Sequence, residues 1–327
     1  MKRLMAAASA LALMTLAACG SSTPDDSSAG PWKFKDDLGT SISLDSAPKR
    51  LIVQSSMAAA LTDLGLGDRI VGTFGPLKNA EGKPDSQVAG LDISAAPDVT
   101  GGGEYGSIDL EKAAGLKPDL VVTSAYLESD LWYVNDATAK KLKTLAPILV
   151  VSFDGKTLPE LLAATERAAE ALGADPEAAR VQAAHEDFKT AADEVADAGA
   201  DLDGKKILVG SPAKDVFYVS NPKVSPDLSY WRDELGLPIV APTKPDAGGY
   251  FQTLSWEQAD LYPADVLLYD DRVGKAGLGI LKKQPVFQTL AAAKAEAYIP
   301  WTSVAPPSYR AYADIMDRLA GELETAG

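Results

Sequence analysis

Short apolar segments alternate with longer amphipathic ones along the chain. The short segments carry the apolar runs expected of strands, at residues 51–53, 70–74, 120–122, 148–151, 207–209, 216–219, 266–269 and 297–301. Segments 158–172, 176–198 and 309–323 place apolar side chains at helical spacing. Strands that alternate with helices predict parallel or mixed sheets covered by helices, which is an α/β fold.

A long uninterrupted helix is expected near the middle of the chain. Segment 175–200 is rich in Ala and Glu and has no Gly or Pro between Pro176 and Gly199. It opens with Asp175 followed by Pro176, which is typical of an N-cap and the first helical position. A helix of about 23 residues is roughly 35 Å long. We expect it to be a strut between two lobes, and a surface helix within one domain is the alternative.

An internal repeat flanks this helix. Residues 107–122 and 253–268 share a Glu that is followed eight positions later by an Asp, after which an apolar strand begins. One copy on each side of the helix predicts two related lobes. The repeated acidic pairs are Glu111 with Asp119 and Glu257 with Asp265.

The residues just before each repeated Glu predict a short helix. Asp109 and Ser255 lie two positions before Glu111 and Glu257 and are suitable N-caps. Both Glu side chains would then lie at the positive end of a helix, which favours a carboxylate.

The predicted organisation is two Rossmann-like lobes joined by a single long α-helix. The N-terminal α/β lobe covers residues 32–174, the linker helix 175–200, and the C-terminal α/β lobe 201–327. This length accords with two lobes, because single cores stop growing near about 250 to 300 residues.

The start of the chain predicts export and anchoring. Residues 1–18 join a basic start to an apolar run that is shorter than the roughly 20 residues of a membrane span, so they predict a secretory signal peptide. The sequence Leu-Ala-Ala-Cys at residues 16–19 resembles the bacterial lipobox, which implies acylation of Cys19, palmitate included, and a mature chain that begins there. An ordinary signal peptide with an incidental Cys is the alternative. Residues 19–31 lack apolar groups and predict a flexible tether. We therefore expect a lipoprotein on the extracytoplasmic face of the cell membrane.

The amino-acid composition argues against several classes of function. Cys19 is the only cysteine and His185 the only histidine, so an internal disulfide, a Ser-His-Asp hydrolase and a His-based metal site are excluded. The formal net charge of −15 argues against nucleic-acid binding. We expect no cofactor and no resident metal site. Ligation of bare ferric iron by Tyr and carboxylates and a carboxylate-pair hydrolase stay open as alternatives.

Two blocks together resemble a known family. Residues 64–72, Leu-Gly-Leu-Gly-Asp-Arg-Ile-Val-Gly, and residues 117–121, Lys-Pro-Asp-Leu-Val, resemble the helical-backbone (class III) substrate-binding proteins of ABC importers. The resemblance covers nearly all of the mature chain. Members deliver ferric siderophores, haem or cobalamin. The resemblance implies a monomeric binding protein rather than an enzyme, which hands a ferric siderophore to an ABC transporter permease.

The resemblance also assigns a role to the repeated glutamates. In this family a surface Glu on each lobe pairs with Arg residues of the permease, and these glutamates resemble Glu111 and Glu257. A two-fold symmetric permease offers two equivalent basic pockets, which a two-lobed monomer matches with one acid per lobe. Capping of short helices alone is the alternative. Many relatives carry a further Glu where Ala59 stands here.

Aromatic residues and one Arg are expected to line a cleft between the lobes, because ligands of open α/β sheets bind beyond the carboxyl ends of the strands. Tyr218 and Trp301 have core positions as an alternative, and the helical spacing of Trp231 with Leu228 and Leu235 favours packing. Few cations accompany Arg272, which favours a neutral hydroxamate chelate of the ferrioxamine type over a trianionic one. Another iron chelate, haem or cobalamin are the alternatives. The candidate ligand residues are Tyr105, Tyr126, Trp132, Tyr218, Trp231, Tyr250, Phe251, Arg272 and Trp301.

Overall fold

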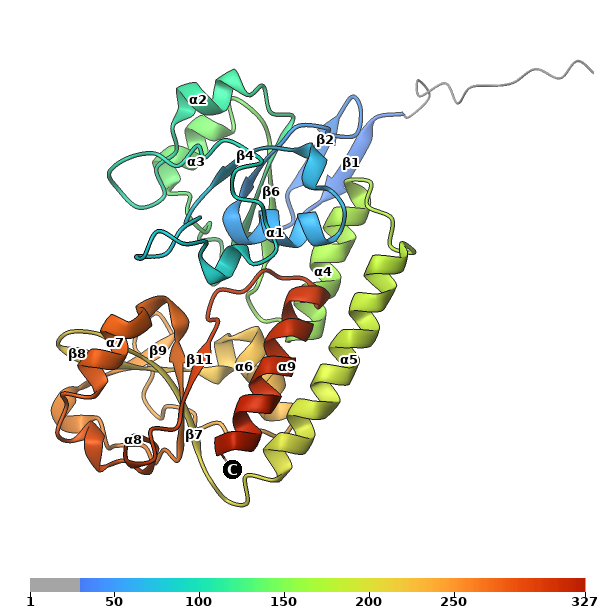
Figure 1. Cartoon of the computed structure of the whole chain (residues 1–327). Coiled ribbons are helices and arrows are strands. Elements are labelled where there is room, and N and C mark those ends of the chain that lie inside the picture. Colours follow the sequence, from blue (N-terminus) through green and yellow to red (C-terminus); the bar gives the residue numbers. More distant parts are fainter. Residues whose placement is uncertain (1–29, 327) are drawn as a thin grey trace, which may run out of the picture.

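The computed structural model describes residues 30–326 as two α/β lobes, one above the other, with long helices along one side (Figure 1). The predicted signal peptide at 1–18, Cys19 and most of the predicted tether at 19–31 lie outside the described residues. No helix in the described part is long and apolar enough to cross a membrane.

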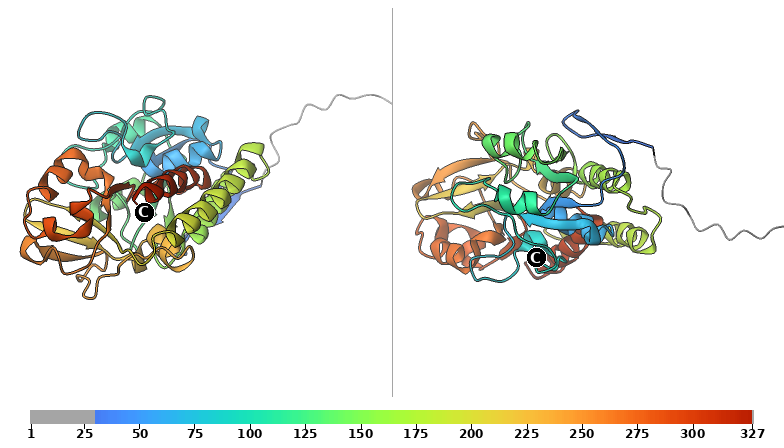
Figure 2. Two further views of the ribbon diagram at one scale, coloured as in Figure 1. Left: turned by 60° about the horizontal axis from the view of Figure 1, so that its bottom comes forward. Right: turned by 90° about the horizontal axis from the view of Figure 1, so that it is seen from above.

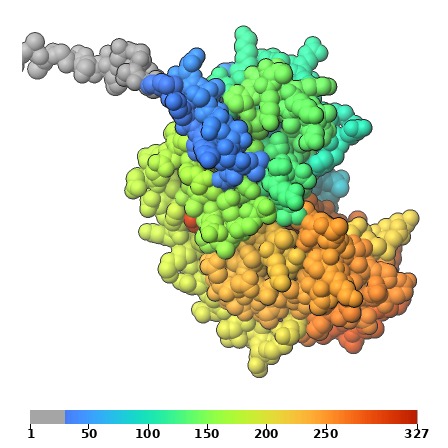
Figure 3. Space-filling model, turned by 180° about the vertical axis from the view of Figure 1, so that it is seen from behind, coloured from blue at the N-terminus to red at the C-terminus, as the bar shows by residue number. Residues whose placement is uncertain are grey.

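The N-terminal lobe is built on a four-stranded parallel sheet of order β4-β3-β5-β6. All residues of β3, β5 and β6 are buried, because both faces of the sheet are covered, and this explains their continuous apolar runs. A separate antiparallel hairpin, β1–β2, precedes this lobe and is seen in blue from behind in Figure 3. The elements are β1 (Trp32–Lys35), β2 (Ser41–Leu44), β3 (Leu51–Gln54), α1 (Ser55–Asp63), η1 (Gly67–Arg69), β4 (Ile70–Phe74), η2 (Ser86–Val88), α2 (Leu110–Gly115), β5 (Leu120–Ala125), α3 (Asp136–Leu142) and β6 (Ile148–Ser152).

The C-terminal lobe contains a five-stranded sheet of order β11-β10-β7-β8-β9. Strands β7, β10 and β11 are parallel, whereas β8 and β9 run antiparallel to their neighbours. Its elements are β7 (Ile207–Pro212), β8 (Val216–Ser220), η3 (Pro222–Val224), α6 (Pro226–Asp233), β9 (Phe251–Ser255), η4 (Trp256–Gln258), β10 (Val266–Asp270), η5 (Asp271–Val273), α7 (Gly274–Leu281), η6 (Phe287–Thr289), α8 (Ala291–Lys294) and β11 (Tyr298–Trp301).

Every predicted strand is present, and the strands that the apolar pattern missed are β1, β2 and β9. In β9 the buried positions are Gln252 and Leu254, while Phe251 and Thr253 are exposed. A polar residue at a buried position and an aromatic one at an exposed position conceal the alternation that marks a strand. Gln252 is tolerated inside because it accepts hydrogen bonds from the Tyr262 hydroxyl and from the backbone N–H of Lys244.

The internal repeat has a structural counterpart in both lobes. The Asp119 carboxylate accepts hydrogen bonds from the backbone N–H groups of Lys49 and Arg50, at 2.8 and 2.9 Å, where β3 begins. In the same way the Asp265 carboxylate accepts one from the backbone N–H of Lys206, at 2.8 Å, just before β7. Each repeated Asp thus ties the strand that follows it to the neighbouring parallel strand. The orders β4-β3-β5-β6 and β8-β7-β10-β11 correspond, with β8 reversed relative to β4.

Three helices bridge the lobes, and the predicted fold class is confirmed. Val181, near the start of the long helix α5, belongs to the N-terminal core, whereas Phe188 and Val195 of the same helix belong to the C-terminal core. Helix α4 likewise places Leu158 in the C-terminal core and Ala168 in the N-terminal core. Helix α9 lies along α5 in all views (Figures 1 and 2). The strut is therefore α5 packed with two partners: α4 (Leu158–Ala171), α5 (Ala179–Ala200) and α9 (Tyr309–Ala326).

The long helix begins at Ala179, later than the predicted residue 175. The Asp175 carboxylate accepts a hydrogen bond from the backbone N–H of Glu177 at 3.0 Å, and the Ala178 N–H bonds the Asp175 carbonyl. Asp175 therefore closes a turn on its own backbone, an arrangement that competes with helix capping.

Replacing Asp119 tests the structural role of the repeat. We expect Asp119→Ala to lower the free energy of unfolding by about 1 to 2 kcal/mol, because two backbone N–H groups lose a charged acceptor. Urea denaturation followed by circular dichroism measures the change. Asp187→Ala is the control, since Asp187 is exposed on α5 and should shift stability by less than about 0.5 kcal/mol. Equal stabilities of the two variants would contradict this role.

Candidate functional site

A cleft of about 260 Å³ lies between the lobes, at the carboxyl ends of the parallel strands β7, β10 and β11. This is the position expected for ligands of open α/β sheets. The N-terminal lobe supplies an aromatic wall, and the C-terminal lobe supplies the floor and the polar groups. The lining residues are Tyr126, Trp132, Ser211, Ser220, Asn221, Val224, Ser225, Pro226, Tyr250, Phe251, Asp270, Arg272, Trp301, Ser303 and Val304.

The N-terminal wall consists of Tyr126 and Trp132, which follow β5. The Tyr126 ring stacks on Phe153 with a centroid distance of 4.3 Å and lies 4.6 Å from the Trp132 ring. Within the described residues, the buried Tyr126 hydroxyl and the buried Trp132 indole N–H have no hydrogen-bond partner. Burial raises the pKa of the Tyr126 hydroxyl well above its usual range, so the group stays protonated and can donate. Two residues that line the cleft therefore carry donors without an acceptor among the described residues.

The loop that carries this wall is strained and braced from behind. Tyr133 has a left-handed backbone with φ of 57°, which is costly for a residue with a bulky side chain. Its backbone N–H donates to the Tyr105 hydroxyl at 3.1 Å, and the two rings lie 4.9 Å apart. Gly106 fits closely here, since a Cβ would stand 2.4 Å from the Asn135 backbone nitrogen. Tyr105 thus supports the aromatic wall and does not itself line the cleft.

The cleft contains one tightly held ion pair. The Arg272 guanidinium donates to both carboxylate oxygens of Asp270, at 3.0 and 2.7 Å. Burial alone would raise the pKa of the Asp270 carboxyl, but the hydrogen bonds and charge of Arg272 and the Ser303 hydroxyl hold it below its usual value. The Arg272 side chain remains 39% exposed, so part of its guanidinium fork is available to a ligand. Among the described residues that line the cleft, Arg272 is the only side-chain cation.

Beneath the cleft, Trp301 is held in one orientation by a buried carboxylate. The Trp301 indole N–H donates to Asp227 at 2.7 Å, and the same carboxylate accepts from the Ser225 hydroxyl and the Leu228 backbone N–H. Burial raises the pKa of the Asp227 carboxyl, and these hydrogen bonds oppose the shift. Trp301 therefore combines a core position with a face on the cleft.

The structure brings six of the nine candidate ligand residues together in the cleft. Tyr218 does not line it but contacts the Phe251 ring at 5.1 Å, and Tyr105 stands behind the wall. The small polar residues of the lining that sequence analysis missed lie at or next to strand ends and in the loop before α6. They are Ser211, Ser220, Asn221, Ser225 and Ser303. Their small, common residue types gave no signal that could have singled them out. The six are Tyr126, Trp132, Tyr250, Phe251, Arg272 and Trp301.

Trp231 requires a correction. Its side chain is 2% exposed and belongs to the C-terminal core together with Leu228 and Leu237, away from the cleft lining. The helical spacing with Leu228 indicated this packing, because α6 turns that face toward the sheet. The structure therefore removes Trp231 from the lining of the cleft.

The repeated glutamates lie on the surface of separate lobes. Glu111 is in the first turn of α2, whose N-cap Asp109 accepts a hydrogen bond from the Lys112 backbone N–H. Glu257 lies in the 3₁₀ helix η4, and a hydrogen bond with the Ser255 side chain lowers its pKa. Both residues are exposed, and neither forms an ion pair with another described residue. Docking to a permease stays a prediction for both.

Residues 30–326 contain no group of three or more His, Cys, Asp or Glu side chains that could hold a metal ion. His185 lies on α5, where its Nε2 is 2.7 Å from the Glu166 carboxylate and its ring stacks on Tyr309. The histidine therefore helps to join the bridging helices.

Comparisons with known proteins agree with this architecture. A family model described as periplasmic binding protein matches residues 52–305. The ferric-siderophore receptor DesE from Streptomyces coelicolor is 35% identical with a TM-score of 0.81, over 90% of this chain and 98% of that one. The siderophore periplasmic binding protein from the fuscachelin gene cluster of Thermobifida fusca is 23% identical with a TM-score of 0.60, over 85% and 97%. FhuD2 from Staphylococcus aureus, with bound ferrioxamine B, is 16% identical with a TM-score of 0.59, over 85% and 99%. No curated protein matches the chain by sequence.

Removing the carboxylate under Trp301 tests how the floor of the cleft is held. We expect Asp227→Ala to lower the free energy of unfolding by about 1 to 3 kcal/mol, because the buried Trp301 N–H loses its acceptor. Chemical denaturation monitored by tryptophan fluorescence measures this. Asp215→Ala changes the same charge at an exposed position of the same lobe and should leave stability nearly unchanged. A stable Asp227→Ala variant would show that water or another group replaces this contact.

Proposed function

The chain belongs to the periplasmic binding protein family, and from that premise we propose that it captures a ferric siderophore and delivers it to the permease of an ABC importer. The observation that carries the proposal is the pair of unpartnered donors in the cleft. A buried donor without an acceptor costs about 1 to 3 kcal/mol. Tyr126, Trp132 and Arg272 line the same cleft, where the carbonyl and hydroxamate oxygens of a chelate would accept hydrogen bonds from all three side chains.

The charges around the cleft favour a ferric hydroxamate of low net charge. Arg272 is already neutralised by Asp270. The pKa of Tyr250 is raised to about 12, by burial first and then by the negative charges of Asp130 and Asp154 on the opposite lobe. A trianionic catecholate chelate would meet this negative field with no side-chain cation besides Arg272 among the described residues that line the cleft, whereas a neutral or cationic hydroxamate would not be repelled.

One relative supports a ferric siderophore as the ligand, and the fold of another accommodates a hydroxamate chelate. DesE, 35% identical over 90% of this chain, is a ferric-siderophore receptor, and FhuD2 was solved with ferrioxamine B. A carboxylate-pair hydrolase gains no support, because Asp270 is engaged by Arg272 and Asp227 by Trp301. We therefore propose a binding protein of the hydroxamate type that performs no chemistry on its ligand.

We further propose that the protein acts from the extracytoplasmic face of the membrane, held there by lipid on Cys19. The lipobox at residues 16–19 supports this anchor, and the polar stretch after it supports a tether. In the anchored monomer, Glu111 and Glu257 would dock on the permease. Their exposure on separate lobes and their lack of ion pairs among the described residues support this role.

Binding is tested with a ferric trihydroxamate of the ferrioxamine type, measured by quenching of tryptophan fluorescence. We expect submicromolar affinity, and a ferric tricatecholate should bind at least roughly tenfold more weakly. The double variant Arg272→Ala with Tyr126→Ala should lose roughly tenfold or more in affinity.

The sharper variant for the same test is Tyr126→Phe. It removes a hydroxyl that has no hydrogen-bond partner in the described part of the chain, so folding should be unharmed while affinity falls. Tyr269→Phe, on β10 outside the cleft lining, is the matched control and should bind normally. Haem or a cobalamin binding in preference to every hydroxamate chelate would overturn the ligand assignment.

Docking is tested by uptake of the same chelate labelled with radioactive iron. We expect Glu111→Ala with Glu257→Ala to abolish most uptake while chelate affinity stays unchanged, because both side chains lie outside the cleft. Glu186→Ala with Glu194→Ala on α5 removes the same charge from other exposed positions and should support normal uptake. Undiminished uptake by the first pair would refute the docking role.

A further inference from the structure

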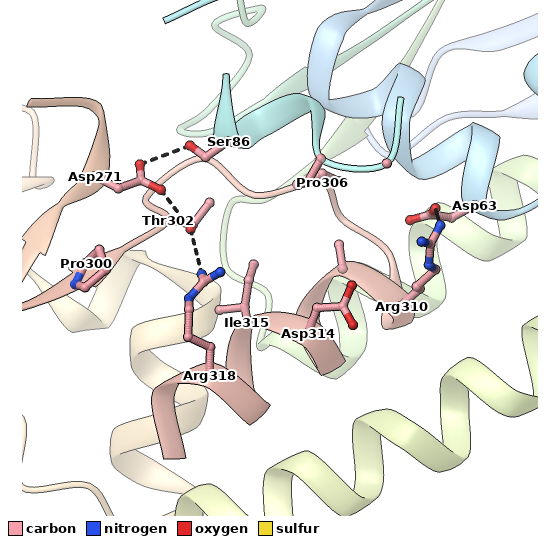
Figure 4. Close-up of a pocket in the computed structure, with 13 residues that line it drawn as sticks. Asp63, Ser86, Asp271, Pro300, Thr302, Pro306, Arg310, Asp314, Ile315 and Arg318 are labelled. Atoms are coloured by element: carbon pink, nitrogen blue, oxygen red, sulfur yellow. Dashed lines mark hydrogen bonds and ion pairs between the residues drawn. The ribbon is translucent and has the colours of Figure 1, made fainter. Parts of the chain in front are cut away.

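A second cavity, of about 380 Å³, lies between the lobes on the other side of η5 from the cleft. Its wall combines residues of α1 and η2 in the N-terminal lobe with residues of η5, β11 and α9 (Figure 4). Of three consecutive residues at the end of β10, two line the cleft and one lines the second cavity. Asp270 and Arg272 line the cleft, whereas Asp271 lines the second cavity.

Asp271 joins the two lobes. One carboxylate oxygen accepts a hydrogen bond from the Ser86 hydroxyl of η2, at 3.0 Å. The other oxygen accepts from the Thr302 hydroxyl at 2.9 Å, and Thr302 in turn accepts from Arg318 of α9 at 3.3 Å. Figure 4 shows this chain of contacts crossing from one lobe to the other. Burial raises the pKa of the Asp271 carboxyl, which the hydrogen bonds from Thr302 and Ser86 oppose.

Both partners of the inter-lobe hydrogen bond are fixed within their own lobes. In η2 the Asp85 carboxylate accepts from the backbone and side-chain N–H groups of Gln87, and Gln87 accepts from the Ser55 hydroxyl at the start of α1. Asp271 is held by its hydrogen bond with the Thr302 hydroxyl, and its backbone directly continues strand β10. Neither residue can move independently of its own lobe. When the lobes separate, the distance between Ser86 and Asp271 must therefore increase.

This contact is separate from the other side-chain contacts between the lobes. Among the residues that the structure describes, the other side-chain hydrogen bonds between the lobes join Asp63 to Ser308 and Arg310, at 2.6 and 2.8 Å. Asp63 and Arg310 also line a third cavity together with residues of α4 and α5, so they lie at the bridge. Ser86 and Asp271 do not line that cavity. The Ser86–Asp271 hydrogen bond is therefore the one of these contacts that holds the residue next to Arg272 against the N-terminal lobe.

We infer that the Ser86–Asp271 hydrogen bond is a latch that keeps the lobes closed over the ligand and positions Arg272 in the cleft. Asp271 is a positioning residue, since it touches the N-terminal lobe rather than the ligand. When the latch opens, η5 loses its support from the N-terminal lobe, and the Asp270–Arg272 pair moves away from the aromatic wall of Tyr126. The inference rests on the proposed capture of a chelate in this cleft.

The test compares Ser86→Ala with the unchanged protein, using a ferric trihydroxamate of the ferrioxamine type in stopped-flow fluorescence. We expect the dissociation rate to rise roughly tenfold with little change in the association rate, because a charge-assisted hydrogen bond of the closed form is lost. Ser94→Ala is the matched control: it removes a Ser–Asp hydrogen bond of the same chemistry, to Asp92, within one lobe. Its kinetics should be unchanged.

A second measurement reads lobe separation without any ligand. Cys19 is the only cysteine, so a chain with Cys19→Ser, Lys140→Cys and Lys283→Cys carries one spin label on each lobe. Double electron–electron resonance should show a longer or broader distance distribution for Ser86→Ala than for Ser94→Ala. Asp271→Ala should reproduce the effect, and adding Ser86→Ala to it should cause no further change.

Unchanged distances and dissociation rates in Ser86→Ala, or additive effects of the two substitutions, would overturn the latch. If no chelate binds but the distances respond as expected, the latch stands and the proposed ligand fails. If chelates bind tightly but Ser86→Ala behaves like Ser94→Ala, the proposed function stands and the latch fails.

Discussion

The packing of α5 into both hydrophobic cores is the constraint on which the rest of the structure depends. One end of the helix buries Val181 in the N-terminal core, and Phe188 and Val195 lie in the C-terminal core. A lobe cannot turn freely without exposing one of these apolar faces to water. With α4 and α9 beside it, α5 fixes which edges of the two sheets face each other, and the cleft lies between those edges.

The cleft combines an aromatic wall with polar groups, and these groups differ in whether they have a hydrogen-bond partner within the protein. Asp270 and Asp227 are fully occupied by Arg272 and Trp301, so they are structural supports. The donors of Tyr126 and Trp132 are buried without an acceptor from residues 30–326. The unpaired polar groups are thus hydrogen-bond donors. They suit a ligand whose outer surface presents oxygen acceptors.

The end of β10 links the two spaces between the lobes. Asp270 and Arg272 face the cleft, and Asp271 between them faces the second cavity and the N-terminal lobe. Because these residues are consecutive, a movement of the lobes that displaces one must displace its neighbours. The lining of the cleft on one side and the contact with the N-terminal lobe on the other therefore belong to a single short segment.

By itself the sequence determined what depends on local chemistry and periodicity. Continuous apolar runs predicted the buried parallel strands, and the helical pattern of α5 together with the repeat around Asp119 and Asp265 predicted two related, bridged lobes. It also predicted six of the residues that line the cleft, because strand ends are recognisable and converge at one edge of a sheet.

Only the tertiary structure decided the rest. It placed Trp231 in the core and Tyr105 behind the wall, revealed β9 with its buried Gln252, and paired Ser86 with Asp271 across 185 positions of sequence. The physical reason is that the direction of a side chain and the partner of a polar group depend on packing between segments distant in the chain, which residue type and spacing do not encode.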